Sequence, residues 1–359
     1  MSADHILILA MYALDRLDRG PQVRIHNLAN ALSELGPTEL IAADRPERPA
    51  KIRDFLRANQ WSRVAGLHVE ANTSWANLSD LRLMSVCRRH HIPIITFIPD
   101  AHPLFPDVLG LSGWKRAAVH LLWWASLQAY YRLSDVIAFQ SESFAGLFRL
   151  PSSVRRLVLP PGANQATTFP LSTEAATLLY AGNGRTSRYG IDILLDGAEL
   201  ARQDIPQLRV ILVCPPEDAP PVSQLDSRPW VTLKHLQTYE IPYEMPGTRA
   251  LVIPFRGIAY HQLLLPIKLM DYLSYGRPIL ATRCREIAHF VEESQVGLIV
   301  DDNPESMAQG IRRLFAANLD ELNRMGQNAL RAAREKHSWR HRAQQVLDTF
   351  EEFRRARPD

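Results

Sequence analysis

Short apolar runs alternate with longer amphipathic segments along the first half of the chain. Six of these runs have the length and composition of buried strands, at residues 5–10, 38–43, 66–71, 92–98, 134–140 and 155–162. The segments between them begin near Gln22, Ile52, Ala76, Trp114 and Ser141, with apolar residues at helical spacing. Strand, helix and strand form the repeating unit of a parallel sheet, so this half predicts a sheet covered by helices on both faces.

The same alternation restarts after residues 162–175, a stretch rich in Pro, Thr and Ala that we interpret as a linker. Six further strand-like runs follow, at residues 177–182, 209–214, 231–236, 250–255, 278–282 and 296–300. A chain of 359 residues is too long for one typical core. We therefore expect two doubly wound α/β domains, residues 1–165 and 172–339, with ligands bound beyond the carboxyl ends of the strands.

Charge and composition narrow the class of protein. The net charge of +3, without a long run of Lys or Arg, argues against a nucleic-acid partner but suits an anionic ligand or membrane surface. Cys87, Cys214 and Cys284 are far apart, as expected for a reduced, cytoplasmic compartment. No apolar run approaches the ~20 residues that span a bilayer, and the N-terminus does not resemble a signal peptide. The histidines show no spacing typical of zinc, so we expect no metal site.

A glycine-rich turn opens the second half. A strand-like run leads into Gly182 and Gly184, and Arg185 and Arg188 follow before the next predicted helix. Glycines let the backbone approach a ligand closely, while a helix start and two arginines favour an anion. The motif predicts a pyrophosphate site, and the alternative of a flexible turn with two solvated arginines stays open.

A second motif, "LLPIKLMDYLSYGRPILAT" at residues 264–282, predicts a helix followed by a strand. Pro266 suits the first helical position, and Gly276 suits the left-handed residue after the helix end. Lys268 and Asp271 lie three residues apart near the helix start. They form either a surface ion pair or a ligand grip, in which the carboxylate accepts hydrogen bonds from a ribose diol and the lysine meets phosphate or sugar oxygens.

In order and content, these motifs resemble family 4 glycosyltransferases. The similar segments are "RGPQVRIHNLANALSELG", "SDVIAFQSESF", "LVLPPGANQATTF", "LLYAGNGRTSRYGIDILL", the lysine-containing motif, "VGLIVDDNPESMAQGIRRLF" and "EKHSW". The resemblance covers most of the chain and is weak from about Pro46 to Trp75. It implies the GT-B fold of two Rossmann-like domains with an interdomain cleft. The helix at about 340–359 is expected to pack back on the N-terminal domain.

The resemblance also implies a nucleoside-diphosphate sugar as donor, with no cofactor. The residues that it assigns to donor binding are Gly20, Gly182, Gly184, Arg185, Arg188, Pro266, Ile267, Lys268 and Asp271. Asp271 would replace the ribose-binding glutamate of the family, and Lys268 would lie beside the diphosphate. The glycine turn is about one residue longer than usual, so the choice between Arg185 and Arg188 as the main phosphate contact stays open. The chain has no Asp-x-Asp motif, which agrees with a metal-independent family.

Two further features bear on the reaction. In "FIPDAHPLFPD", Asp100 and His102 compete for the position at which many family members have a histidine facing the reacting sugar. Either can bind a sugar hydroxyl or help to deprotonate an acceptor, and the alternative is a Pro-rich loop with an Asx-turn. Glu142 is expected to be a capping or dipole partner. Leu263 stands where many members have a glutamate that contacts the donor sugar.

The segment 113–133, "GWKRAAVHLLWWASLQAYYRL", combines aromatic and basic residues. It is either a core-facing helix or an interfacial helix that attaches the protein to a membrane near a lipid-linked acceptor.

We therefore predict a retaining, cytoplasmic glycosyltransferase of polysaccharide or glycoconjugate biosynthesis, with peripheral attachment to the inner face of the cell membrane as a secondary hypothesis. It would transfer a sugar from a nucleotide-sugar donor to a saccharide or lipid-linked acceptor. Two alternatives remain open. One is a degenerate family member that binds donor without transferring it, in view of Leu263. The other is a sugar-nucleotide epimerase of the same fold.

Overall fold

The chain divides into two compact units. The computed structural model describes residues 4–15, 17, 20–221, 223 and 225–355. The first unit comprises Met1–Gly162 and Trp339–Asp359, and the second comprises Ala163–Ser338. Most of the expected linker, residues 162–175, belongs to the second unit. The buried guanidinium of Arg277 holds it there by donating hydrogen bonds to the carbonyl oxygens of Phe169 and Pro170, at 2.8 and 3.1 Å.

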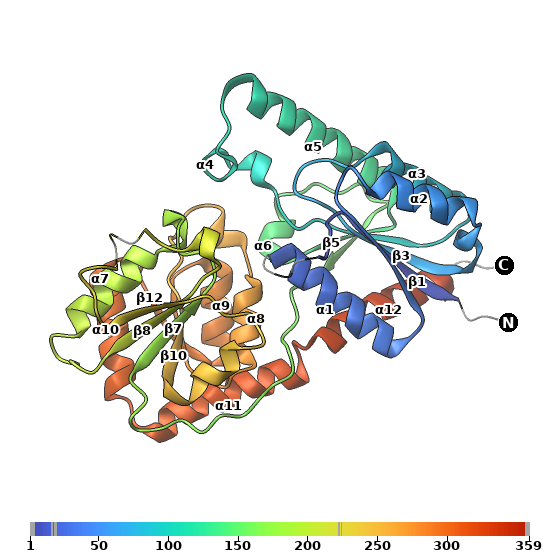
Figure 1. Ribbon diagram of the computed structural model, residues 1–359. Coiled ribbons are helices and arrows are strands. Elements are labelled where there is room, and N and C mark those ends of the chain that lie inside the picture. Colours follow the sequence, from blue (N-terminus) through green and yellow to red (C-terminus); the bar gives the residue numbers. More distant parts are fainter. Residues whose placement is uncertain (1–3, 16, 18–19, 222, 224, 356–359) are drawn as a thin grey trace. The chain divides into compact units, whose positions relative to one another are not determined.

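The first unit is built on a six-stranded parallel sheet (Figure 1). Its strands are β1 (His5–Ala10), β2 (Thr38–Ala42), β3 (Val64–Glu70), β4 (Ile94–Phe97), β5 (Val136–Phe139) and β6 (Arg155–Val158). They lie in the order β2-β1-β3-β4-β5-β6. Its helices are α1 (Gly20–Leu35), α2 (Arg48–Arg57), α3 (Leu78–Arg89), α4 (Pro106–Leu109), α5 (Gly113–Leu133), α6 (Glu142–Ala145) and α12 (Trp339–Arg355).

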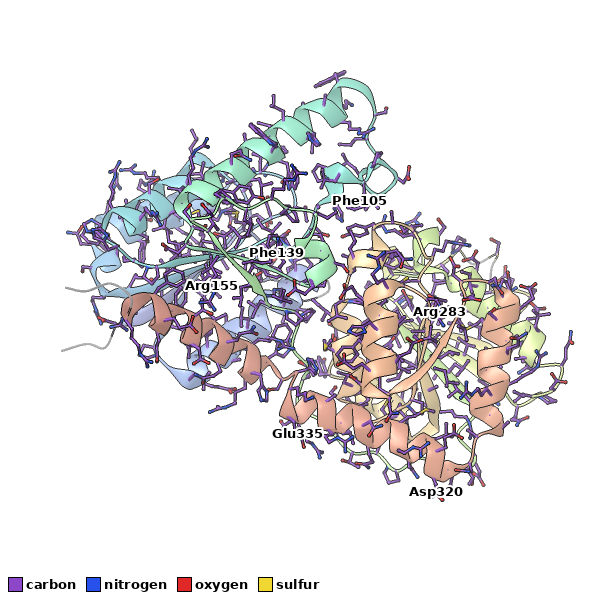
Figure 2. All side chains as sticks on the ribbon, turned by 180° about the vertical axis from the view of Figure 1, so that it is seen from behind. Phe105, Phe139, Arg155, Arg283, Asp320 and Glu335 are labelled. Atoms are coloured by element: carbon purple, nitrogen blue, oxygen red, sulfur yellow. The ribbon has the colours of Figure 1, made fainter. Side chains whose placement is uncertain are left out.

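Helices cover both faces of this sheet. Apolar residues of α1 and α12 form one buried cluster with β1, β4 and β5. Phe350 of α12 lies so close to Gly66 of β3 that a Cβ there would sit 2.7 Å from the Phe350 ring. The helices α2 and α3 lie on the other face in Figure 1. Phe139, labelled in Figure 2, is fully buried in β5 and stacks on Phe148, with ring centroids 4.9 Å apart.

The second unit has a parallel sheet of the same size. Its strands are β7 (Thr177–Ala181), β8 (Arg209–Val213), β9 (Val231–Lys234), β10 (Thr248–Ile253), β11 (Ile279–Thr282) and β12 (Gly297–Val300). Its α-helices are α7 (Ile191–Ala201), α8 (Ile267–Leu273), α9 (Arg285–Ser294), α10 (Pro304–Ala316) and α11 (Leu319–Glu335). The strand order β9-β8-β7-β10-β11-β12 is that of a classical nucleotide-binding Rossmann sheet.

Alternation along β7 shows why both faces of this sheet are apolar. Leu178 and Tyr180 belong to the core under α7 and α10, whereas Leu179 belongs to the core under α8, α9 and α11. Successive side chains of a strand point to opposite faces, so a strand buried on both faces reads as a continuous apolar run. All twelve predicted strands and the two doubly wound sheets are thereby confirmed.

Candidate functional site

The topological switch point of the second unit brings the two motifs of the sequence together. The strands β7 and β10 are neighbours, and the chain leaves them toward helices on opposite faces of the sheet. The glycine turn follows the carboxyl end of β7, and residues 254–266 follow the carboxyl end of β10 and lead into α8. Ligands of open α/β sheets bind at such a point. Both motifs therefore lie beyond carboxyl ends of strands, where the sequence predicted that ligands bind.

Three glycines of the turn are required by close contacts. A Cβ on Gly182, whose φ is +136°, would lie 2.5 Å from Nζ of Lys268. A Cβ on Gly184 would lie 3.0 Å from Sγ of Cys214. Gly190, with φ +66°, has no room for a Cβ, which would come within 1.8 Å of the Pro254 carbonyl oxygen. The turn is thus fitted against the segment after β10 and against Lys268.

Asn183 fixes the turn from inside, a role that the sequence reading missed. Its Oδ1 accepts hydrogen bonds from the backbone N–H groups of Arg185 and Thr186, at 3.1 and 2.9 Å. Its carbonyl oxygen accepts one from the Tyr180 hydroxyl at 2.7 Å. An Asn between two glycines is the sequence signal for such an Asx-turn. The turn is therefore held by specific hydrogen bonds of Asn183 as well as shaped by its glycines.

The two arginines differ in their surroundings. Arg185 is exposed, and its guanidinium donates to the Glu217 carbonyl oxygen at 3.2 Å. Arg188 is half-buried and lies over the Tyr189 ring, with Cζ 5.1 Å from the centroid. Its Nε is buried and has no hydrogen-bond partner among the described residues. Of the two arginines of the turn, Arg188 is therefore the one with a buried donor that has no partner among the described residues.

Lys268 is surrounded by aromatic rings and has no carboxylate partner among the described residues. Its Nζ donates to the Tyr180 hydroxyl at 3.0 Å and lies 4.1, 5.0 and 5.6 Å from the ring centroids of Tyr180, Phe255 and Tyr189. Burial lowers the pKa of Lys268 to about 7. A half-buried cation whose neighbours are ring faces and a hydroxyl is short of negative charge, so an anionic ligand would be stabilised beside it.

Asp271 is the only acidic residue of α8, and burial governs its chemistry. Its Oδ1 accepts a hydrogen bond from Nδ2 of Asn164 at 2.8 Å, and burial raises its pKa to about 7. Within the described residues it forms no ion pair with Lys268 or with any other cation, and burial alone accounts for its raised pKa. The interpretation of Lys268 and Asp271 as a surface ion pair is therefore wrong. The carboxylate keeps an oxygen that can accept from a hydroxyl donor.

Local structure around α8 differs slightly from the expectation. Pro266 is the N-cap residue, so Ile267, not Pro266, begins the helix. The helix has only seven residues and ends before Gly276, which has the predicted left-handed conformation with φ +62°. Because α8 is so short, the chemistry of this site depends on side chains and on the glycine turn more than on the dipole of α8.

His261 is a second residue that the sequence reading missed. It lies in a 3₁₀ turn, His261–Leu263, and its ring stacks on Phe255 with centroids 4.6 Å apart. Nδ1 lies 2.9 Å from the Arg256 carbonyl oxygen, which only accepts, so Nδ1 carries the proton. Burial, together with the smaller effect of the charges of Arg188 and Lys268, lowers the pKa of His261 to about 4. Both cations therefore act on one small region.

The candidate residues of the first unit lie at the carboxyl edge of its sheet. Nε2 of His102 is 3.3 Å from Oδ1 of Asp100, so the two competing candidates form one pair. Gly20 is the first residue of α1 and follows residues 16, 18 and 19, which lie outside the described part of the chain. Ser141, rather than Glu142, caps α6 by accepting from the Phe144 N–H at 3.0 Å, and Glu142 occupies the first turn.

A buried polar cluster lies under α1, and the sequence pattern did not predict it. Nε of Arg24 lies 3.3 Å from both carboxylate oxygens of Glu70, and Nε2 of His68 lies 2.9 Å from Oε1 of the same carboxylate. The Arg24 guanidinium stacks 3.5 Å above the Phe97 ring. The arginine holds the pKa of Glu70 below its usual value although burial alone would raise it. This cluster anchors the start of α1 to the sheet.

No group of three or more metal-ligating side chains is present in the described part of the chain. The cations of the site are instead arginine and lysine side chains. These can stabilise a diphosphate by charge and hydrogen bonding.

Known structures share this architecture. The chain is similar to sucrose-phosphate synthase from Thermosynechococcus elongatus, with 14% identity and a TM-score of 0.70 over 99% of this chain and 100% of that one. It is similar to HepE from Anabaena in complex with UDP, with 14% identity and a TM-score of 0.67 over 97% and 99% of the two chains. It is also similar to WaaG, a glycosyltransferase involved in lipopolysaccharide biosynthesis, with 13% identity and a TM-score of 0.66 over 96% and 99%. The fold is that of GT-B glycosyltransferases, as the resemblance implied.

The sequence comparison points to one part of the chain. Residues 175–317 match the family model of Glycosyl transferases group 1. This range extends from the strand before the glycine turn to the end of α10 and includes Arg188, Lys268 and Asp271. Among curated protein sequences, none matches significantly.

Proposed function

We propose that the protein is a glycosyltransferase that takes its sugar from a nucleoside-diphosphate sugar held by the second unit. The observation that carries this proposal is the convergence of three groups at one switch point. The glycine turn is fitted around Lys268, the Nε of Arg188 is buried and unpartnered, and Asp271 has no counter-ion in the described part of the chain. Two cations and a carboxylate suit a diphosphate and a ribose diol, respectively.

The roles follow from these surroundings. Lys268 and Arg188 neutralise the diphosphate as its bond to the sugar breaks, and Asp271 accepts hydrogen bonds from the ribose hydroxyls. Arg185, which is exposed, adds a peripheral phosphate contact. Gly182 and Gly184 bring backbone close to the diphosphate, while Pro266 and Ile267 set the position of Lys268.

For the reaction itself, we propose a family 4 transferase that retains anomeric configuration and needs no metal ion. The acceptor attacks on the face from which the diphosphate leaves, and a diphosphate oxygen takes the acceptor proton. Asp100 and His102 are the groups of the first unit for holding a sugar hydroxyl or assisting deprotonation. The acceptor is a saccharide or a lipid-linked saccharide, in cytoplasmic polysaccharide or glycoconjugate biosynthesis. The acceptor and the pathway are proposed by analogy with the family and with WaaG.

Nucleotide binding is the first test. Thermal unfolding of the purified protein is measured with UDP, GDP, ADP, dTDP and CMP, with UDP first because HepE is described as a complex with UDP. A ligand at about 100 times its dissociation constant adds roughly 2.7 kcal/mol of stability. We expect one nucleoside diphosphate to raise the melting temperature of the wild type and not that of Asp271→Ala.

The control is Asp301→Ala, which removes a carboxylate 67% exposed in the same unit. It should keep the response of the wild type. If no nucleotide stabilises the wild type, the proposed donor site is wrong. Binding of a nucleotide sugar with neither transfer nor hydrolysis would favour the degenerate family member, and release of an altered nucleotide sugar without an acceptor would favour an epimerase.

A further inference from the structure

The first turns of α5 extend away from the core of their own unit. Residues 111–117 are exposed on every side, and Figure 1 shows this end of α5, together with α4, projecting past the sheet that the helix covers. Phe105, labelled in Figure 2, lies just before α4. Farther along the helix, Trp123, Leu127 and Tyr130 are buried. The expectation of a core-facing helix is thus correct for the second half of α5 and wrong for the first.

Large apolar side chains gather on the part of α5 that faces solvent. Trp114 is 77% exposed, Leu121 63% and Trp124 51%, whereas the neighbouring Trp123 is only 6% exposed. Helical spacing places Trp114 and Leu121 on one stripe, with Leu122 and Trp124 on either side. Monomeric soluble proteins seldom expose a contiguous apolar patch of this kind without an interaction partner.

The charges on this helix have a single sign. Lys115 and Arg116 lie in its first turn and Arg132 in its last, and the sequence has no Asp or Glu from residue 108 to residue 134. Cations at the start of a helix oppose its dipole, so Lys115 and Arg116 are placed against the local preference. A shallow groove of about 690 Å³ follows the same side, lined by Gly113, Arg116, Ala117, His120, Leu121 and Trp124. The surface therefore suits an apolar partner with negative charge at its boundary.

We infer that the α5 surface, defined by Trp114, Lys115, Arg116, Leu121, Leu122 and Trp124, docks the protein on the anionic surface of a lipid bilayer. Tryptophan and leucine side chains enter the boundary between headgroups and acyl chains, and the two cations meet lipid phosphates. The contact that we infer is peripheral. In the described part of the chain no helix is long and apolar enough to cross a membrane. This inference does not depend on the proposed glycosyl transfer.

The test is co-sedimentation with vesicles in the absence of donor and acceptor. One set contains phosphatidylcholine alone and the other phosphatidylcholine with phosphatidylglycerol. We expect the full-length protein to bind the anionic vesicles, and the double variant Trp114→Ser with Trp124→Ser to bind them roughly tenfold less. The double variant Lys115→Gln with Arg116→Gln should lose the part of binding that salt screens. Circular dichroism confirms that each variant is folded, and Trp123 is left in place because it belongs to the core.

The matched control is Tyr239→Ser with Tyr243→Ser, which removes two exposed aromatic side chains from the second unit. It should bind vesicles as the wild type does. The inference is overturned if the wild type stays in solution with anionic vesicles, or if the control loses as much binding as the tryptophan variant. It is also overturned if the tryptophan variant merely converts a dimer to a monomer by light scattering, since the surface would then cover a second copy. Nucleotide stabilisation should be unchanged in all variants, which separates this test from the test of the donor site.

Discussion

Burial moves the pKa of Lys268 down and that of Asp271 up, each to about 7. A bound diphosphate favours the ammonium form of Lys268, and ribose hydroxyls favour the ionised form of Asp271. Donor affinity should therefore fall above pH 7, as free Lys268 loses its proton, and below pH 7, as free Asp271 gains one. We expect a bell-shaped dependence of affinity on pH with its maximum near 7, changing by up to about tenfold per pH unit on each side.

Calorimetric titration with an intact nucleotide sugar measures this dependence, because its diphosphate diester does not titrate near neutrality. Lys268→Met should flatten the alkaline side only, and Asp271→Asn the acidic side only. Lys234→Gln, which removes a partly exposed lysine paired with Glu244, should leave both sides intact. An affinity independent of pH from 6 to 8 in the wild type would show that neither group changes protonation on binding.

Residue types and spacing predicted which side chains belong to the proposed donor site, but not the surroundings of those side chains. The apolar runs and turn residues around Gly182 and Lys268 predicted that both motifs follow the carboxyl ends of strands, and both are observed there. The spacing of Lys268 and Asp271 also suited an ion pair, which the structure does not contain within its described residues. Their separate partners, Tyr180 and Asn164, are distant in sequence, so no local pattern indicates them.

The glycine turn packs so closely on the segment after β10 that a larger side chain at Gly190 cannot be accommodated without a backbone shift. Gly190 has φ +66°, and a Cβ there would come within 1.8 Å of the Pro254 carbonyl oxygen. Backbone in both segments must shift to admit a methyl group, so Gly190→Ala should cost roughly 3 kcal/mol or more of unfolding free energy. Chemical denaturation measures the loss, and nucleotide stabilisation should weaken with it.

Gly247→Ala is the matched control, since nothing lies within 4 Å of a Cβ at Gly247 and its φ is not positive. It should change the free energy of unfolding by less than about 0.5 kcal/mol. Equal losses in the two variants would mean that the fit of Gly190 against Pro254 is not what holds the turn.

At the level of elements, apolar runs predicted all twelve strands because strands buried on both faces have few polar residues. Helix ends were less accurate: α2 begins at Arg48 rather than near Ile52, because Pro49 opens the helix and Arg48 is buried against Asp80. The burial of α5 was not predictable from periodicity alone. The sequence does not indicate which of two adjacent tryptophans is buried. Only the tertiary structure shows that Trp123 is buried and that Trp124 is exposed.

For the whole molecule, the C-terminal helix α12 completes the core of the first unit although it follows the second unit in sequence. Phe350 packs directly on Gly66, and every buried member of its cluster belongs to the first unit. Phe350→Ala should therefore cost about 3–5 kcal/mol, as buried aromatic truncations do. Hydrogen exchange should become faster in β1 and β3 and stay unchanged in β7 and β10. Since the proposed donor site lies within the second unit, nucleotide stabilisation of β7 and β10 should survive the substitution. Faster exchange in both sheets would contradict this division, because it would mean that the two units unfold together.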